Sequence, residues 1–112
     1  MDRTKPIIVT LFGKEVELQP FRSRPENTIT SWHYLDTRGC YSLDAHVQHF
    51  EDETDFTAII DLQMSISTYT LANITSDETA DTPENAMRLV EQSFNKMLTT
   101  IQDTVKELKE GK

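Results

Sequence analysis

The sequence predicts an α+β domain in which an antiparallel meander sheet of four or five strands packs on one long C-terminal helix, making two layers. Within residues 7–74, apolar and polar side chains alternate in several short segments, as they do in half-buried strands. Residues 82–110 instead carry apolar side chains at steps of three and four, which is typical of an amphipathic helix. We therefore expect a single domain with strands at about 7–74, an acidic loop at 75–81 and the helix at 82–110.

Residues 7–19 are predicted to form a β-hairpin. An apolar run begins at Ile7, and Gly13 and Lys14 supply a two-residue turn with glycine first. After the turn, Val16 and Leu18 alternate with polar residues, so one face of the returning strand is expected to meet water.

The next segment is predicted to contain a loop, a strand and a tight turn. Two prolines make residues 20–28 a loop, because proline lacks a backbone donor and disfavours helix. Residues 29–35 follow as a strand rich in aromatic side chains. Residues 36–39 are expected to form a type I turn that Gly39 closes in the left-handed conformation.

Residues 41–50 fit two structures. As a strand, this segment places Leu43 and Val47 on one apolar face together with Tyr41. As a helix, it would group Leu43, Val47 and Phe50 behind a cap at Ser42. We favour the strand.

Residues 56–66 show the clearest alternation in the chain and predict a long, half-buried antiparallel strand. Beyond Thr68 the apolar residues change phase to Tyr69 and Leu71, so a bulge or bend is expected there. Residues 76–81 are polar and acidic, and they are predicted to form a loop that leads to the helix.

The C-terminal helix has consistent start and stop signals. Thr82 is the expected cap, Pro83 suits the first helical position, and Gly111 ends the helix. The apolar stripe consists of Met87, Val90, Phe94, Met97, Leu98, Ile101, Val105 and Leu108. We expect this stripe to form half of the core. A coiled-coil seam is the alternative, since some of its residues repeat every seven.

The predicted elements do not cover one another completely. Five strands ~4.8 Å apart make a sheet ~24 Å wide, of which one helix about 10 Å across covers less than half. At ~1.5 Å per residue the helix is ~42 Å long, whereas a compact domain of this length has a radius of gyration near ~13 Å. The last turns of the helix are therefore expected to overhang the sheet, and a homodimer or another partner is expected to cover the exposed apolar surface.

Composition indicates a folded protein of the cytoplasm. The chain has 112 residues, of which 37% are hydrophobic and 27% charged, so it is large enough to bury a core without disulfides. Cys40 is the single cysteine, which fits a reducing compartment. The apolar run at 7–12 is too short for a signal peptide or a membrane span.

The net charge of -8 comes from one segment of the chain. Residues 41–82 contain nine acidic residues and no lysine or arginine, while the segments on either side are close to neutral. A surface of this kind either keeps the protein in solution or attracts a basic partner.

Signatures of catalysis are missing from the sequence, so we predict that the protein is not an enzyme and carries no cofactor. It contains no phosphate-binding loop, dinucleotide fingerprint, paired-cysteine zinc motif or nucleophile elbow. Asp44, His46, His49 and Glu51 would suit a divalent metal if 41–50 were helical. On a strand, His46 and His49 point to opposite sides, so no metal site is predicted.

Three hypotheses for function follow. The first is a non-enzymatic inhibitor or adaptor that binds a basic, nucleic-acid-handling protein, but not nucleic acid itself, through carboxylates of residues 44–81. Its acidic candidates are Asp44, Glu51, Asp52, Glu53, Asp55, Asp77, Glu78 and Asp81, and its possible aromatic anchors are Trp32, Tyr34 and Tyr41. The second is a structural or assembly protein that self-associates through the helix and the exposed sheet. A phage origin is considered with it, because residues 10–18 resemble openings of small phage virion and assembly proteins, a resemblance that assigns no family. The third is a small-ligand site between sheet and helix.

Overall fold

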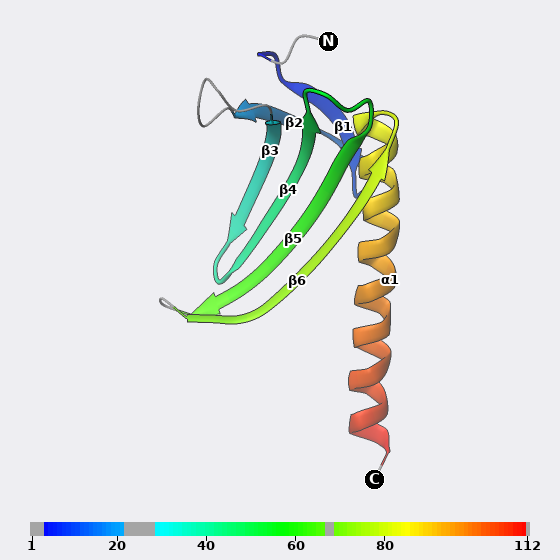
Figure 1. Ribbon diagram of the computed structural model, residues 1–112. Helices are drawn as coiled ribbons and strands as arrows, with labels where there is room; N and C mark the ends of the chain where they lie inside the picture. The colour runs from blue at the N-terminus through cyan, green and yellow to red at the C-terminus, as the bar shows by residue number, and fades with distance from the viewer. Residues whose placement is uncertain (1–3, 22–28, 67–68, 112) are drawn as a thin grey trace.

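The computed structural model describes residues 4–21, 29–66 and 69–111, and within them it shows a six-stranded antiparallel sheet beside one long helix (Figure 1). The strands follow one another across the sheet in chain order, as a meander. The elements are β1 (Ile7–Leu11), β2 (Lys14–Phe21), β3 (Ile29–Arg38), β4 (Tyr41–Phe50), β5 (Phe56–Ile66), β6 (Tyr69–Ala80) and α1 (Pro83–Glu110). The predicted α+β fold class is confirmed, with six strands among the described residues rather than four or five.

The hairpin of β1 and β2 turns one residue earlier than predicted. Leu11 pairs with Lys14, so the turn consists of Phe12 and Gly13. Both turn residues have positive φ, 51° and 81°, as the mirror-image turns that match the twist of a hairpin require. The Phe12 ring packs on Phe94 of α1, with ring centroids 5.9 Å apart. This contact with the helix explains why a phenylalanine occupies a strained turn position.

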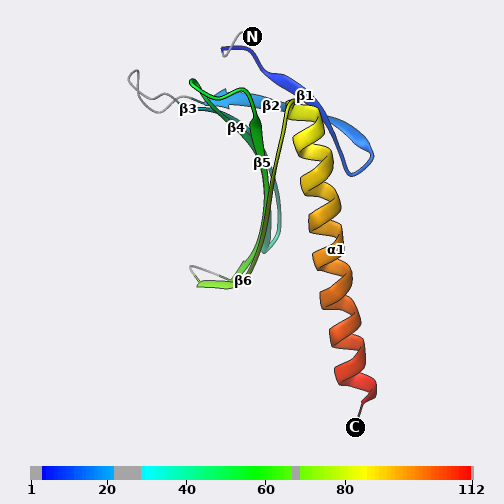
Figure 2. The same ribbon diagram turned by 45° about the vertical axis from the view of Figure 1, so that its right-hand side comes forward.

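The hairpin is joined to the rest of the sheet at one end of β2. Its pairing with β3 involves residues Gln19 to Phe21, and the hairpin crosses the other strands near the start of α1 (Figure 2). The loop predicted at 20–28 is therefore wrong for its first two residues, which belong to β2. The remaining part of that prediction, 22–28, lies outside the described residues.

The turn between β3 and β4 is also displaced from its predicted position. Arg38 pairs with Tyr41, so the turn consists of Gly39 and Cys40 rather than residues 36–39. Gly39 has φ of 60°, the left-handed conformation expected for it. Strand pairing thus continues through Asp36, because a two-residue turn leaves the residues before it free to enter the ladder.

The two central strands agree with the sequence interpretation. Residues 41–50 form β4, not a helix, and β4 pairs with a neighbour on each side. Residues 56–66 form β5 as predicted. The alternating side chains Ala45 and Val47 are completely buried on one face of β4, which is the burial that a strand between two neighbours provides.

Strand β6 was not predicted with its full extent. The bulge expected beyond Thr68 is confirmed, because Met64 pairs with Ala72 and Ser65 with Thr70, which leaves Leu71 without a register partner. The chain also reverses direction, which was not predicted, since Ile66 pairs with Tyr69 and β6 runs antiparallel to β5. The acidic loop predicted at 75–81 is wrong, because β6 continues to Ala80. Polar residues on both sides of the strand hid the alternation: Thr75, Asp77 and Thr79 are exposed, whereas Ser76 is buried and Glu78 faces α1.

The core lies between the sheet and the first half of α1. The helix contacts β6 and β5 and also β1, so it bridges the two edges of the curled sheet and gives a half-barrel (Figure 2). The buried apolar side chains are Val9, Leu11, Val16, Leu18, Trp32, Ala45, Val47, Phe56, Ala58, Ile60, Ala86, Met87, Val90 and Phe94. The helix begins at the predicted cap, where Thr82 Oγ1 accepts a hydrogen bond from the Asn85 amide at 3.1 Å.

The second half of α1 extends beyond the sheet, as the length argument predicts. All residues at 101–110 are exposed, and the helix projects away from the strands (Figure 1). The radius of gyration is 16.1 Å, above the ~13 Å of a compact domain of this size. The prediction that the whole stripe lies in the core is therefore wrong for Ile101, Val105 and Leu108. No helix in the described part of the chain has the length and apolarity needed to cross a bilayer.

Candidate functional site

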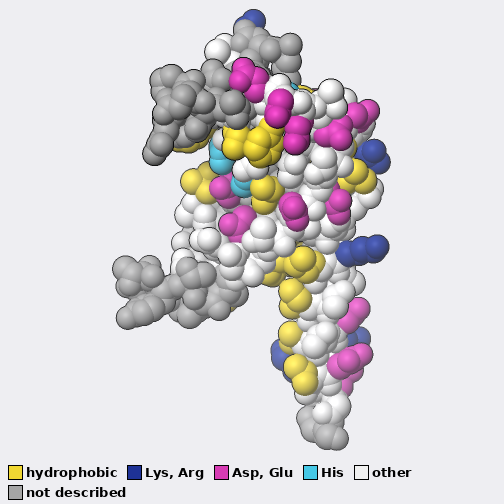
Figure 3. Space-filling view, viewed as in Figure 1, with side chains coloured by type: hydrophobic (Ala, Val, Ile, Leu, Met, Phe, Trp, Pro, Cys, Tyr) yellow, Lys and Arg dark blue, Asp and Glu magenta, His cyan; other side chains and the backbone are white. Residues whose placement is uncertain are grey.

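Three potential metal ligands meet on the sheet face that points away from α1. His33 of β3 is the register partner of His46 of β4, and Asp44 lies two residues before His46, so all three side chains share one face. His33 Nδ1 lies 3.4 Å from Asp44 Oδ1, and His46 Nδ1 lies 3.5 Å from the same oxygen. The ligand atoms of the three residues lie within 4.8 Å of one another. Figure 3 looks onto this face and shows histidines beside acidic side chains.

The two imidazoles of this cluster have different surroundings. Their rings stack with centroids 4.7 Å apart. His33 Nε2 lies 3.0 Å from Ser31 Oγ, whereas the buried His46 Nδ1, 3.5 Å from Asp44 Oδ1, has no hydrogen-bond partner among the described residues. Burial lowers the pKa of His46 below its ordinary value, and the nearby Asp44 carboxylate opposes this shift only in part. His46 is therefore held mainly in the neutral form at pH 7.

Asp61 of β5 adds a second negative charge beside the cluster. It is the register partner of Asp44, and like charges directly opposite each other in a sheet are unfavourable. Thr75 of β6 donates a hydrogen bond to Asp61 Oδ1 at 3.0 Å. His33, whose Nδ1 lies 3.4 Å from Asp44 Oδ1, and the Thr75 hydroxyl thus each give one of the two adjacent carboxylates a hydrogen bond.

Only two of the four metal ligands considered from the sequence come together. Asp44 and His46 share the outer face, but His49 lies on the helix side, where its ring stacks on Phe56 at 4.3 Å. Glu51 belongs to the turn after β4. Sequence reasoning missed His33, because it placed the β3–β4 turn at residues 36–39, and with that turn His33 does not pair with His46. Placing the turn at Gly39 and Cys40 would have paired these two histidines.

The acidic candidates fall into two groups. The first group, which we name the acidic rim, is exposed at one end of the sheet: two of its acids flank the Phe56–Ala80 pair, and the others lie in the turn between β4 and β5. The acidic rim consists of Glu51, Asp52, Glu53, Asp55 and Asp81. The second group, Asp44 and Asp77, lies on the outer face. Glu78 points the other way and accepts a hydrogen bond from Ser93 Oγ of α1 at 2.7 Å.

The aromatic candidates differ in their access to a partner. Trp32 is completely buried, and its Nε1 donates a hydrogen bond to the backbone oxygen of Lys5 at 3.0 Å. Tyr34 packs against the core and is half-buried. Tyr41, the first residue of β4, is exposed. Of the three, Tyr41 is the one that presents an aromatic surface to solvent.

An apolar surface lies where the strands leave the helix. A hollow of about 200 Å³ is lined by Tyr41, Leu62, Met64 and Ile74. At this end the strands curve away from α1, and the helix continues alone (Figure 2). Ile101, Val105 and Leu108 of the helix are 42%, 45% and 74% exposed. We name these seven residues the apolar wedge.

Comparisons with known proteins do not extend this description. No protein-family model, curated protein or solved structure matches the chain. The function must therefore be argued from the chain's own residues.

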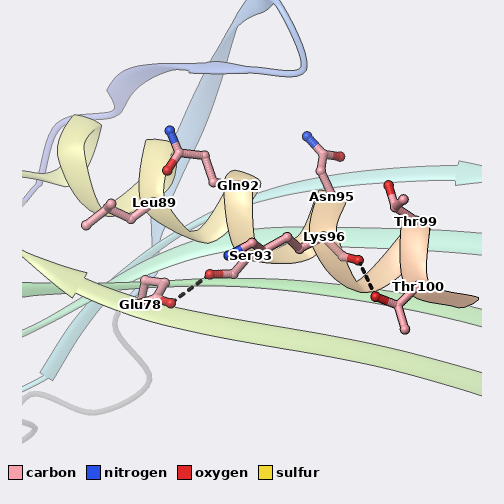
Figure 4. A pocket seen from close by; sticks show the side chains of 8 residues that line it. All are labelled: Glu78, Leu89, Gln92, Ser93, Asn95, Lys96, Thr99 and Thr100. Carbon is pink, nitrogen blue, oxygen red and sulfur yellow. Dashed lines mark hydrogen bonds between the residues drawn. The ribbon is translucent and has the colours of Figure 1, made fainter.

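A shallow depression of about 690 Å³ follows α1 beside β6 (Figure 4). Two of its polar side chains bind within the chain: Ser93 donates to Glu78, and Thr100 Oγ1 donates to the backbone oxygen of Lys96 at 3.0 Å. The side chains of Gln92 and Asn95 point away from the Glu78–Ser93 pair (Figure 4), so the lining does not present converging donors or acceptors to a ligand.

Proposed function

We propose that this chain is a non-enzymatic structural or assembly protein that self-associates through the apolar wedge. The observation that carries the proposal is the exposure of every residue at 101–110 although the apolar stripe continues through this part of the helix. An amphipathic helix normally buries its apolar face. Here the chain's own sheet covers only the first half of that face, so the second half is available to a partner.

Burial of the overhang would be favourable. Removing apolar surface from water contributes about 25 cal/mol per Å², and large exposed apolar patches on soluble proteins mark interaction sites. An isolated helical segment shorter than ~12–15 residues is marginal in water. Residues 101–110 are therefore held by continuity with the packed half of α1, and contact with a second surface would stabilise them further.

A second copy of the chain fits this surface for two reasons. First, one molecule presents both a protruding apolar ridge, at Ile101, Val105 and Leu108, and an apolar hollow beside Tyr41 and Leu62. A two-fold arrangement could place the ridge of each copy in the hollow of the other. The ridge also continues the stripe that already packs on this sheet, so its chemistry matches the sheet's apolar side.

Second, the charge distribution permits two copies to approach at this end. The acidic rim lies near the start of α1, and residue 101 is ~27 Å further along at ~1.5 Å per residue. This separation exceeds the Debye length of about 8 Å at physiological ionic strength. Residues 101–110 carry two lysines and three acidic residues, so the overhang is nearly neutral. Repulsion between the acidic rims of two copies is therefore largely screened at the overhang.

Light scattering after size exclusion, at low and high salt, tests the proposal. The full chain is expected to be a dimer at both salt concentrations, because apolar burial is not screened. Ile101→Asp should give a monomer, and the matched control Thr99→Asp, which adds the same charge to the opposite face, should remain a dimer. Circular dichroism checks that both variants are folded. A monomeric wild-type protein, or a dimer that survives Ile101→Asp, would refute the proposal.

The acidic rim supports a second candidate function, the inhibitor or adaptor that binds a basic protein. Its five carboxylates are all exposed at one end of the sheet, which would speed encounter with a positive surface. A lysine-rich polypeptide is a suitable probe. Reversing residues Glu51, Asp52, Glu53 and Asp55 to lysine should abolish its binding and the salt dependence of that binding. Unchanged binding by this variant would eliminate the candidate.

A further inference from the structure

The His33, Asp44 and His46 cluster has a composition that neither the fold nor self-association requires. Two imidazoles and a carboxylate are the ligand set that borderline divalent ions prefer. We infer that these three side chains bind one divalent first-row transition-metal ion, with Zn²⁺ as the representative, on the sheet face away from α1.

The distances suit a metal ion with only small adjustments. Metal–ligand bonds of ~2.0–2.1 Å place neighbouring ligand atoms about 3 Å apart. The separations of His33 and His46 Nδ1 from Asp44 Oδ1, 3.4 and 3.5 Å, are already close to this value. The ligand nitrogens that the two imidazoles offer lie within 4.8 Å of each other. Rotation about χ2 would close it, because this torsion has a broad energy minimum in histidine.

The Nδ1 atoms of both histidines face Asp44. Without a metal ion, His33 Nδ1 donates to Asp44 Oδ1 at 3.4 Å, because a carboxylate only accepts. When an ion takes the place of this proton, Ser31 Oγ, which lies 3.0 Å from Nε2 of His33, can accept the Nε2 proton and leave Nδ1 as a ligand. Metal-binding histidines commonly donate their second ring N–H in this way. His46 Nδ1 is buried without a hydrogen-bond partner among the described residues, and coordination would satisfy it. The ion would also offset the charges of Asp44 and its register partner Asp61.

The cluster is accessible to an ion from solution. The side chains of His33 and Asp44 are 37% and 38% exposed, whereas that of His46 is 14% exposed. His33 also lines an open cavity of about 380 Å³ together with Gln19, Pro20 and Phe21. Three protein ligands leave a position for water or another molecule. The site is on the opposite side of the sheet from α1, so it does not depend on the proposed self-association.

Isothermal titration of Zn²⁺ into the metal-stripped, tag-free full chain tests this inference. Every sample carries Cys40→Ser, because the exposed thiol of Cys40 could itself bind zinc. We expect one ion per chain. His33→Asn and Asp44→Asn, both at partly exposed positions, should weaken binding at least about 100-fold, since loss of an outer partner alone typically costs about 10- to 100-fold. Ser31→Ala should weaken it about 10-fold.

His49→Asn is the matched control, because His49 lies on the other face of the same strand. It should leave Zn²⁺ affinity unchanged, and circular dichroism should show that all variants are folded. Absence of saturable binding at millimolar Zn²⁺ would overturn the inference. So would equal affinities of the wild type, His33→Asn and Asp44→Asn, or an equal loss in His49→Asn.

Discussion

The two halves of helix α1 have the same apolar periodicity but opposite surroundings. Met87 and Val90 in the first half are completely buried, whereas Ile101 and Leu108 in the second half are exposed. The spacing of apolar residues defines a face of the helix without saying what covers it. The covering depends on where the strands curve away from α1 (Figure 2). The comparison shows that one apolar stripe can be covered by the chain's own sheet in one half and left exposed to solvent in the other.

The largest difference between the halves should appear when a core aromatic is truncated. Phe94→Ala removes a side chain that is 2% exposed and packs on Phe12. We expect the free energy of unfolding to fall by about 3–5 kcal/mol, as is usual for a buried phenylalanine. Urea denaturation at low protein concentration measures this change. A loss below about 1 kcal/mol would show that the first half is not packed as described.

A smaller effect is expected at the cap of the packed half. Thr82→Ala removes the hydroxyl that accepts the Asn85 amide and should cost about 1 kcal/mol of stability. Thr99→Ala, at an exposed position in mid-helix, is the control and should change stability by less than about 0.5 kcal/mol. Thermal unfolding compares the two. Equal effects would mean that the capping bond does not contribute.

The smallest effect on the monomer is expected in the overhang. Leu108→Ala should change the stability of the monomer by less than about 0.5 kcal/mol, because its side chain is 74% exposed. The same substitution should weaken the dimer, which sedimentation at several protein concentrations would measure. A variant that destabilises the monomer as strongly as Phe94→Ala would remove the distinction between the two halves.

The elements of this fold could be predicted from sequence, whereas their register could not. Alternation identified β5, and Thr82 with Pro83 marked the start of α1, because these signals are local. The β3–β4 turn consists of Gly39 and Cys40 in the structure, whereas the sequence predicted residues 36–39, because several residues before Gly39 also suit a turn. Displacing a turn changes every cross-strand pair that follows from it.

The sequence did not predict the candidate metal site, because the β3–β4 turn was placed at the wrong residues. His33 and His46 face each other only if the turn consists of Gly39 and Cys40. The acidic character of β6 caused a different error, because the carboxylate of Asp77 suits an exposed strand position as well as a loop. Exposure of the helix end followed from length alone, and so it could be predicted before the strands were placed.

Hydrogen exchange at residues 101–110, measured at low and high protein concentration, tests the proposed role of the overhang most directly. An unpacked helix end opens readily, and its amides exchange fast, whereas an interface protects them. The account predicts that protection of these amides rises with protein concentration, while the amides at 83–94 stay protected throughout. Fast exchange at 101–110 at every concentration would contradict the claim that this half of α1 binds a second copy.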